Sequence, residues 1–253
     1  MKKKYEIQFD RYVKKFDFSN KEIAFKYYHS YRVEELMKKL SDRLYLNDEN
    51  KELAAIIGLL HDIGRFEQIK KYGTSSDTKT GVDHAAQSCI YLFDRNHIRD
   101  FIDDDSYDQV IRDAIMNHNK FEIDRNLQGK SQFLTHMIRD MDKVDIYRVI
   151  VENFDIEFNW RDVSKNVNQS FDNHQPVLNA DRKTKSDNVV ANLAFIFDIK
   201  FKESLDILEE TGYLDDYFNK MKYEEQIKYK VLSLRREVDR YIKGRKDEYE
   251  RIG

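Results

Sequence analysis

The chain is poor in the residues that break helices or cross-link loops. Its 253 residues include one cysteine, one proline and eight glycines. The lone cysteine, Cys89, excludes an internal disulfide, and a free thiol is typical of a reducing compartment, so we expect a cytoplasmic protein. Because glycine and proline disfavour helices most, their scarcity predicts an all-α fold.

The sequence also lacks a long apolar run and an excess of charge of either sign. Leu53–Leu60 is the longest nearly unbroken apolar run, about a third of the length that a bilayer-spanning helix requires. The N-terminal residues lack the apolar stretch of a signal peptide. With 44 basic and 47 acidic residues, the net charge of -3 gives no strong nucleic-acid signal. We therefore expect no membrane partner, and the charge balance neither supports nor excludes a nucleic acid.

Hydrophobic periodicity predicts an amphipathic helix over residues 21–40. Phe25, His29, Val33 and Leu40 fall on one stripe of that helix. Because the rest of the stripe is apolar, we expect it to face the core. The pattern therefore directs the imidazole of His29 inward.

A more apolar helix is expected over residues 50–62, running through the centre of the fold. It ends at the sequence HDIGR of residues 61–65, where Gly64 is a natural helix terminator. Polar residues 66–82 then predict a loop that leads to His84, in the first turn of the next helix. Since both ends of this loop lie next to candidate site residues, we expect it to border the entrance of the site.

Two further predicted helices, over residues 106–119 and 131–151, place His118 and Asp142 on otherwise apolar stripes. Burying a histidine or an aspartate is costly unless the group is hydrogen-bonded, paired or bound to a metal. Helical bundles build metal sites from side chains on facing helices. Imidazole nitrogen combined with carboxylate oxygen suits divalent Mn, Fe, Co, Ni or Zn, and the carboxylates also allow Mg; we expect one or two such ions. The candidate ligands are His29, His61, Asp62, His84, His118 and Asp142.

The order of these residues resembles the HD superfamily of metal-dependent phosphohydrolases. The resemblance rests on His29, the His61-Asp62 doublet and Asp142 in the sequence MDKVD, and HDIGR is close to the form of the HDIG branch. It implies an HD-domain helical bundle. We therefore place the catalytic core at residues 1–155 and a helical extension, packed on that core, at residues 156–253.

The resemblance also implies a role for each ligand. Both residues of the doublet, together with His29 and Asp142, would hold a first metal. In binuclear members of the family the aspartate of the doublet bridges to a second metal, and His84 and His118 fit the remaining positions. Asp62 is therefore the predicted catalytic residue. Two cations that share a water lower its pKa, and the resulting hydroxide would attack the substrate phosphorus.

A phosphate substrate also requires positive groups near the metals. Arg65 follows the doublet, Lys120 follows His118, and Arg139 lies about one helical turn before Asp142. These three are the predicted phosphate contacts. The same side chains would equally serve as ordinary ion pairs at the surface.

The resemblance narrows the function to hydrolysis of a phosphate ester or anhydride in a small molecule, with a nucleotide favoured. Cyclic-dinucleotide phosphodiesterases of the HD-GYP type carry a His-His pair where this chain has His118-Asn119. Alarmone hydrolases carry an acidic pair where it has Arg65-Phe66. We expect neither activity. Two alternatives stay open: a di-iron oxygenase of HD fold, which the same ligands would suit, and a non-catalytic module that binds a nucleotide.

Overall fold

The computed structural model describes residues 2–250, most of which are helical. This confirms the predicted all-α fold. The chain forms two compact units, residues 1–141 and 142–253. The predicted boundary at residue 155, and the packing of residues 156–253 on the core, stay predictions.

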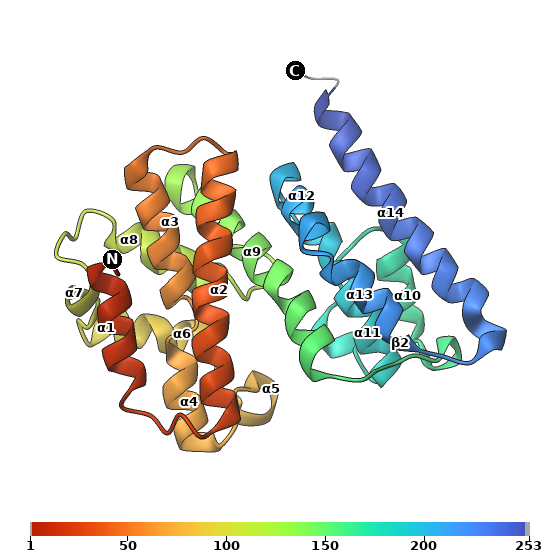
Figure 1. The fold of residues 1–253 in the computed structure, drawn as a ribbon, viewed down its shortest axis with the longest axis horizontal. Helices are drawn as coiled ribbons and strands as arrows, with labels where there is room; N and C mark the ends of the chain where they lie inside the picture. The colour runs from red at the N-terminus through yellow and green to blue at the C-terminus, as the bar shows by residue number, and fades with distance from the viewer. Residues whose placement is uncertain (1, 251–253) are drawn as a thin grey trace. The chain divides into compact units, whose positions relative to one another are not determined.

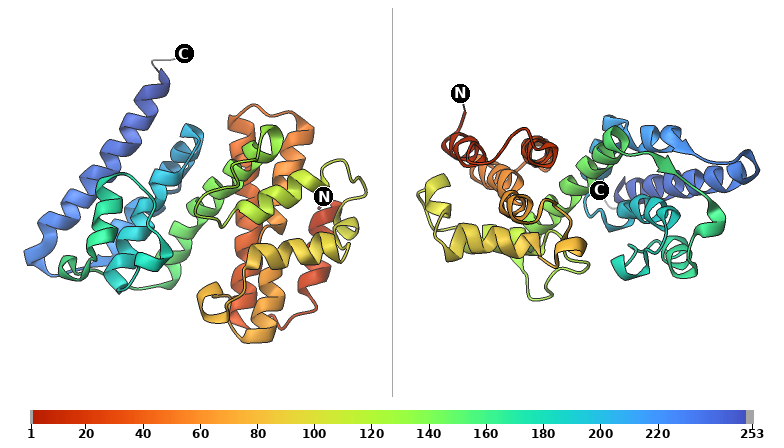
Figure 2. Two further views of the ribbon diagram at one scale, coloured as in Figure 1. Left: turned by 180° about the vertical axis from the view of Figure 1, so that it is seen from behind. Right: turned by 90° about the horizontal axis from the view of Figure 1, so that it is seen from below.

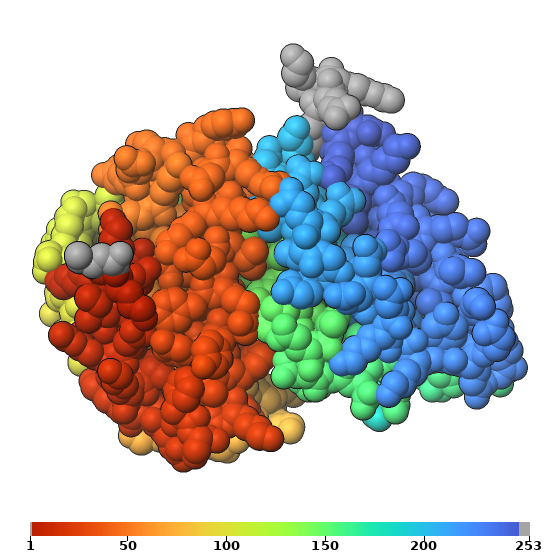
Figure 3. Space-filling view, viewed as in Figure 1, coloured from red at the N-terminus to blue at the C-terminus, as the bar shows by residue number. Residues whose placement is uncertain are grey.

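The first unit is built around two long antiparallel helices, α2 (Lys21–Arg43) and α3 (Asp48–Leu60), which lie side by side (Figure 1). α1 (Lys4–Val13) packs on α3, and α1 and α2 form much of the face of this unit seen in Figure 3. α6 (His84–Cys89) and α8 (Asp108–Asn117) cross the opposite side, as the view from behind shows (Figure 2). The remaining elements are α4 (Gly64–Tyr72), α5 (Asp77–Thr80), the π-helical η1 (Ile90–Asp94), α7 (Ile98–Phe101) and the first part of α9 (Gly129–Asn153).

The close approach of α2 and α3 explains how the doublet reaches the interior. All residues from Leu53 to Leu60 are buried, as expected for a central helix. A Cβ at Gly58 would lie 2.9 Å from the Cα of Glu34 on α2, so a glycine is required for the two backbones to approach. Because α3 is buried to its last residue, His61 and Asp62 enter the core with it.

The structure corrects two expectations for the segment after the doublet. Gly64 does not terminate a helix: it is the first residue of α4, and a Cβ there would meet the backbone nitrogen of Ser88 at 2.5 Å. Most of residues 66–82 fold as α4 and α5 rather than as a loop. The overlooked signal is the pair Phe66 and Ile69, which are about one turn apart and both buried. This pair anchors α4 although most of its other residues are polar.

The second unit is helical apart from a short parallel pairing of β1 (Ile156–Glu157) with β2 (Met221–Lys222). Nowhere in residues 2–250 does the structure contain a helix with the length and apolarity needed to cross a bilayer. The other elements are the end of α9, η2 (Trp160–Asp162), α10 (Lys165–Asp172), η3 (Asn179–Asp181), α11 (Lys185–Leu193), η4 (Ala194–Asp198), α12 (Lys202–Thr211), α13 (Tyr213–Lys220), η5 (Glu225–Ile227) and α14 (Lys228–Glu250).

Candidate metal centre

Five of the predicted ligands come from four helices of the first unit. His29 lies on α2, His61 and Asp62 follow the last residue of α3, His84 begins α6, and His118 is the C-cap residue of α8. All five residues are buried, with exposed fractions between 0% and 5%. The predicted burial of His29 and His118 is therefore confirmed.

The carboxylate of Asp62 lies between two pairs of histidines. Its Oδ2 atom is 3.7 Å from Nε2 of His29 and 3.8 Å from Nε2 of His61. Its Oδ1 atom is 3.3 Å from Nε2 of His84 and 3.9 Å from Nε2 of His118. Asp62 thus belongs to two groups of potential metal ligands, one with each pair.

Asp142 belongs to a third group. One potential ligand atom from each of His61, His118 and Asp142 lies within 4.8 Å of the others. Asp142 is the first residue of the second unit, but it follows Met141 within the unbroken helix α9. The structure therefore brings the predicted ligands together, and their coordination of a metal stays a proposal.

Hydrogen bonds orient three of the histidine rings. Nδ1 of His61 lies 2.7 Å from the carbonyl of Gly58, and Nδ1 of His118 lies 2.6 Å from the carbonyl of Ile115. A carbonyl only accepts, so each Nδ1 carries a proton, and in the neutral ring the lone pair is then on Nε2, which faces the cluster. Nε2 of His84 is 2.9 Å from Nε2 of His118. A positive species between these nitrogens, a proton or a metal, would relieve the repulsion of their lone pairs.

The electrostatics of Asp62 fit a divalent cation. Burial by itself would raise the pKa of this carboxyl, but nearby positive charge, that of Lys26 first and also that of Arg65, holds the pKa well below its usual range. The group is therefore ionised. Its Oδ1 atom is buried and accepts no hydrogen bond from the described residues. A buried anionic oxygen in this state, next to imidazole nitrogens, is suited to a metal.

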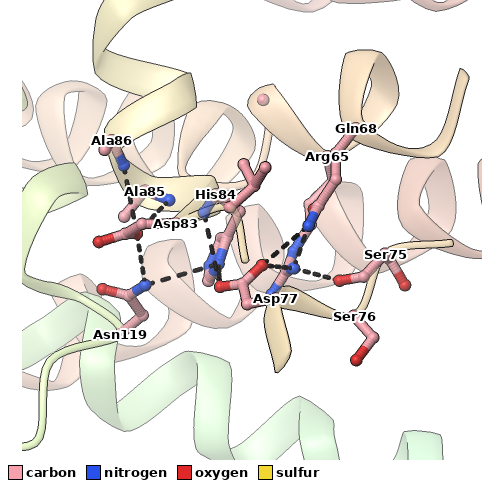
Figure 4. Close-up of polar contacts among 12 residues, drawn as sticks. Arg65, Gln68, Ser75, Ser76, Asp77, Asp83, His84, Ala85, Ala86 and Asn119 are labelled. Atoms are coloured by element: carbon pink, nitrogen blue, oxygen red, sulfur yellow. Dashed lines mark hydrogen bonds and ion pairs between the residues drawn. The ribbon is translucent and has the colours of Figure 1, made fainter. Parts of the chain in front are cut away.

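Asp77 connects His84 to Arg65 (Figure 4). Its Oδ2 atom lies 2.5 Å from Nδ1 of His84, and its Oδ1 atom accepts from Arg65 at 2.5 Å and from Gln68 at 3.0 Å. Burial opposes ionisation of Asp77, yet the hydrogen bond from His84 and the charge of Arg65 lower its pKa. The segment of residues 66–82 thus contacts the cluster, and its role at the entrance stays a prediction.

Asp83 fixes the start of α6, where His84 lies. Its Oδ1 atom accepts from the backbone nitrogens of Ala85 and Ala86 and from the side chain of Asn119 (Figure 4). Lys120 forms an ion pair with its other oxygen. This network joins α6 to the turn after α8, and so holds His84 and His118 in one arrangement.

Two of the predicted phosphate contacts, Arg65 and Lys120, form ion pairs with acidic side chains. Arg65 binds Asp77, and its Nε lies 3.5 Å from Oδ1 of Asp62. Lys120 pairs with Asp83, and its side chain keeps 38% exposure. Both cations therefore lie within or beside the cluster, each with an acidic partner.

Arg139 has a different environment. It is 4% exposed, and its guanidinium donates to the backbone carbonyls of Asn117, His118 and Lys120. It therefore holds the turn that carries His118. This placement favours a positioning role for Arg139, and its predicted contact with phosphate stays a prediction.

Lys26 is a site residue that the sequence analysis did not single out. Its Nζ donates to Oδ2 of Asp62 at 2.6 Å, and its side chain is 13% exposed. Lys26 lies three residues before His29 on α2, about one turn away on the same face. That spacing was the available signal. The contact places a positive charge on the oxygen that faces His29 and His61.

The comparisons with known proteins agree with this geometry. A family model described as HD domain matches residues 27–175, more than half of the chain. The matched segment contains His29, the His61-Asp62 doublet and Asp142. Neither the comparison with curated proteins nor the comparison with solved structures finds a match.

Proposed function

The chain belongs to the HD domain family, and from this premise we propose that it hydrolyses a phosphate ester or anhydride of a small molecule, with a nucleotide as the favoured class. Proteins with this domain are generally metal-dependent hydrolases. The observation that supports the proposal most is the position of Asp62 between two histidine pairs. A carboxylate with one oxygen toward each pair is suited to hold two cations at a fixed separation.

The residues of the cluster would hold the metals in a prepared geometry. His29, His61, Asp62 and Asp142 are the proposed ligands of one ion, and Asp62, His84 and His118 those of a second. When bound, divalent ions would supply Lewis acidity and a water activated for attack on phosphorus. The hydrogen bonds of His61 and His118 to backbone carbonyls fix their Nε2 atoms toward the cluster before a metal arrives.

Positive side chains around the cluster support an anionic substrate. Lys26 and Arg65 lie on either side of the Asp62 carboxylate, and Lys120 lies beside α6. Fixed cations of this kind stabilise the charge that develops on phosphoryl oxygens. The preference for a nucleotide comes from the sequence resemblance.

The ligand set itself supports a second candidate function. Two histidine-rich groups that share one carboxylate would also suit a di-iron centre that activates dioxygen. Iron-dependent oxygen consumption with an organic substrate, without phosphate release, would favour this candidate. Turnover of no phosphate compound and no oxygen would favour the non-catalytic module.

A phosphate-release screen tests the proposal. Protein purified without added metal is analysed for metal content and then assayed with nucleotides, cyclic nucleotides and sugar phosphates. We expect release from at least one class, and its loss in His29→Ala and His84→Ala. His97→Ala is the matched control, because this histidine pairs with Asp100 and its side chain is 41% exposed. Activity that survives both cluster substitutions would contradict the proposal.

A further inference from the structure

Lys26 neutralises a buried carboxylate that the proposed metals would also use. Its Nζ lies 2.6 Å from Oδ2 of Asp62, the oxygen that faces His29 and His61. We propose that Lys26 exchanges partners: its ammonium holds Asp62 while metal is absent, and binds a phosphoryl oxygen of the substrate once metal is bound. The inference rests on the proposed function, because it requires both a metal and a phosphate.

The burial of Asp62 explains why a lysine is needed there. The residue is 2% exposed, and a buried carboxylate without a counter-charge is strongly destabilising. Arg65 approaches the other oxygen, with Nε 3.5 Å from Oδ1, but its guanidinium is bonded to Asp77 and to the Ser75 carbonyl. Lys26 instead donates a hydrogen bond directly to Oδ2 of Asp62.

A divalent ion on Oδ2 would remove the need for this ion pair. It would bring further positive charge to the oxygen that the ammonium contacts, and cations a few ångströms apart repel each other strongly in a buried site. Lys26 is able to respond, because lysine has a flexible four-carbon stem. Its side chain is 13% exposed, against 3% for those of Asp62 and His29, so it lies nearer to solvent than the groups that it contacts.

Phosphate is the partner whose chemistry fits the released ammonium. An ammonium has three N–H donors and no acceptor, and lysine binds phosphate as a point charge. A phosphoryl group that reaches metals held by His29 and His61 must come next to Lys26. Lys26 is therefore a better candidate for phosphate binding than Arg139, whose guanidinium binds backbone carbonyls.

Titration with Mn²⁺ tests the first half of the exchange. Lys26→Met removes the charge and keeps most of the side-chain length, so Mn²⁺ should bind about tenfold more tightly than to the wild type. Lys26→Arg should bind Mn²⁺ like the wild type. Lys21→Met is the control, since Lys21 is an exposed lysine in the first turn of the same helix. Unchanged or weaker binding of Mn²⁺ to Lys26→Met would overturn the proposal.

Binding of inorganic phosphate to the Mn²⁺-loaded protein tests the second half. Lys26→Met should bind phosphate about tenfold more weakly than the wild type, because one charge-assisted hydrogen bond is lost. Lys26→Arg and Lys21→Met should retain the affinity. Equal binding of phosphate by Lys26→Met and the wild type would overturn the proposal.

A labelling experiment on the wild-type chain requires no variant. The rate of reductive methylation at each lysine is measured by mass spectrometry. Without metal, Lys26 should be modified more slowly than Lys21. After Mn²⁺ is added, Lys26 should be modified several-fold faster than it was without metal. A rate at Lys26 that Mn²⁺ leaves unchanged, in a chain that binds Mn²⁺, would overturn the exchange alone. A wild-type chain that binds no divalent metal would contradict both the exchange and the proposed function.

Discussion

Oδ2 of Asp77 lies 2.5 Å from Nδ1 of His84, and this pair determines which nitrogen of the ring faces Asp62. A carboxylate that accepts from Nδ1 fixes the tautomer with its lone pair on Nε2, and raises the basicity of that nitrogen. The same carboxylate binds Arg65, so the orientation of His84 is linked to the cation beside the doublet. Asp77 therefore acts as a positioning residue for the proposed second metal.

Asp77→Ala should lower the affinity for the second metal by roughly 10- to 100-fold. This is the usual loss when a residue that orients a metal ligand is removed. The first metal should be retained, since the ring that Asp77 orients, that of His84, is a proposed ligand of the second metal. Stepwise titration with a chelator measures the two affinities. Asp100→Ala is the matched control, because it removes the partner of His97, whose side chain is 41% exposed, away from the cluster. Loss of neither metal from Asp77→Ala would show that Asp77 does not position His84.

The buried carboxyl of Glu34 should make the stability of the fold depend on pH. Burial raises the pKa of this carboxyl to about 7 from an unfolded value of 4.5, with Lys38 opposing and Glu6 adding to the shift. Between these values the folded state binds a proton that the unfolded state has released, so stability falls as pH rises from 4.5 to about 7. Above that range the carboxyl is ionised in both states, and its burial lowers the free energy of unfolding by on the order of 3 kcal/mol.

Urea unfolding of Glu34→Gln at pH 5 and pH 8 measures this effect. The substitution should flatten the fall in stability over this range, because glutamine does not titrate. Glu35→Gln is the control, since Glu35 also pairs with Lys38 but its side chain is 70% exposed, and it should keep the wild-type slope. A wild-type slope in Glu34→Gln would assign the pH dependence to other groups.

Gly58→Ala should destabilise the fold by about 1–3 kcal/mol, the usual cost of overpacking a close-packed core. The added Cβ would meet the backbone of Glu34 at 2.9 Å, and backbone does not move aside as a flexible side chain does. Gly244→Ala has open space around its Cβ and should be neutral or stabilising by up to about 1 kcal/mol. Thermal unfolding compares the two variants. Equal melting temperatures would show that α2 and α3 have room to separate.

The parts of the site that could be predicted from sequence are those with a local pattern. His29 lies on an apolar stripe, and the doublet ends an apolar helix, so each side chain had a predictable direction. The order of these residues with Asp142 then indicated a shared metal site. That step came from the resemblance to the HD superfamily, whereas periodicity along single helices predicted only the direction of each side chain.

The parts of the site that were not predicted depend on contacts between segments that are distant in the sequence. Asp77 lies on α5, a four-residue helix within a polar stretch, and only the packing of that stretch brings its carboxylate to His84. Lys26 falls near the stripe of His29, but a lysine on a helix is usually a solvated side chain, and its contact with Asp62 depends on the approach of α2 to the end of α3. Arg139 is a further case, because its bonds to the backbone carbonyls of Asn117, His118 and Lys120 depend on packing that its position in the sequence does not show.

The metal content of Asp62→Asn is the most direct test of the account. The protein is loaded with Mn²⁺, freed of excess ion and analysed for bound metal, phosphate release and helical content. We predict two ions per chain in the wild type, and in Asp62→Asn at most one, bound weakly, with phosphate release lost. The fold should remain, since the buried residues from Leu53 to Leu60 supply the packing of α3. A folded Asp62→Asn variant with wild-type metal content and wild-type phosphate release would contradict the account.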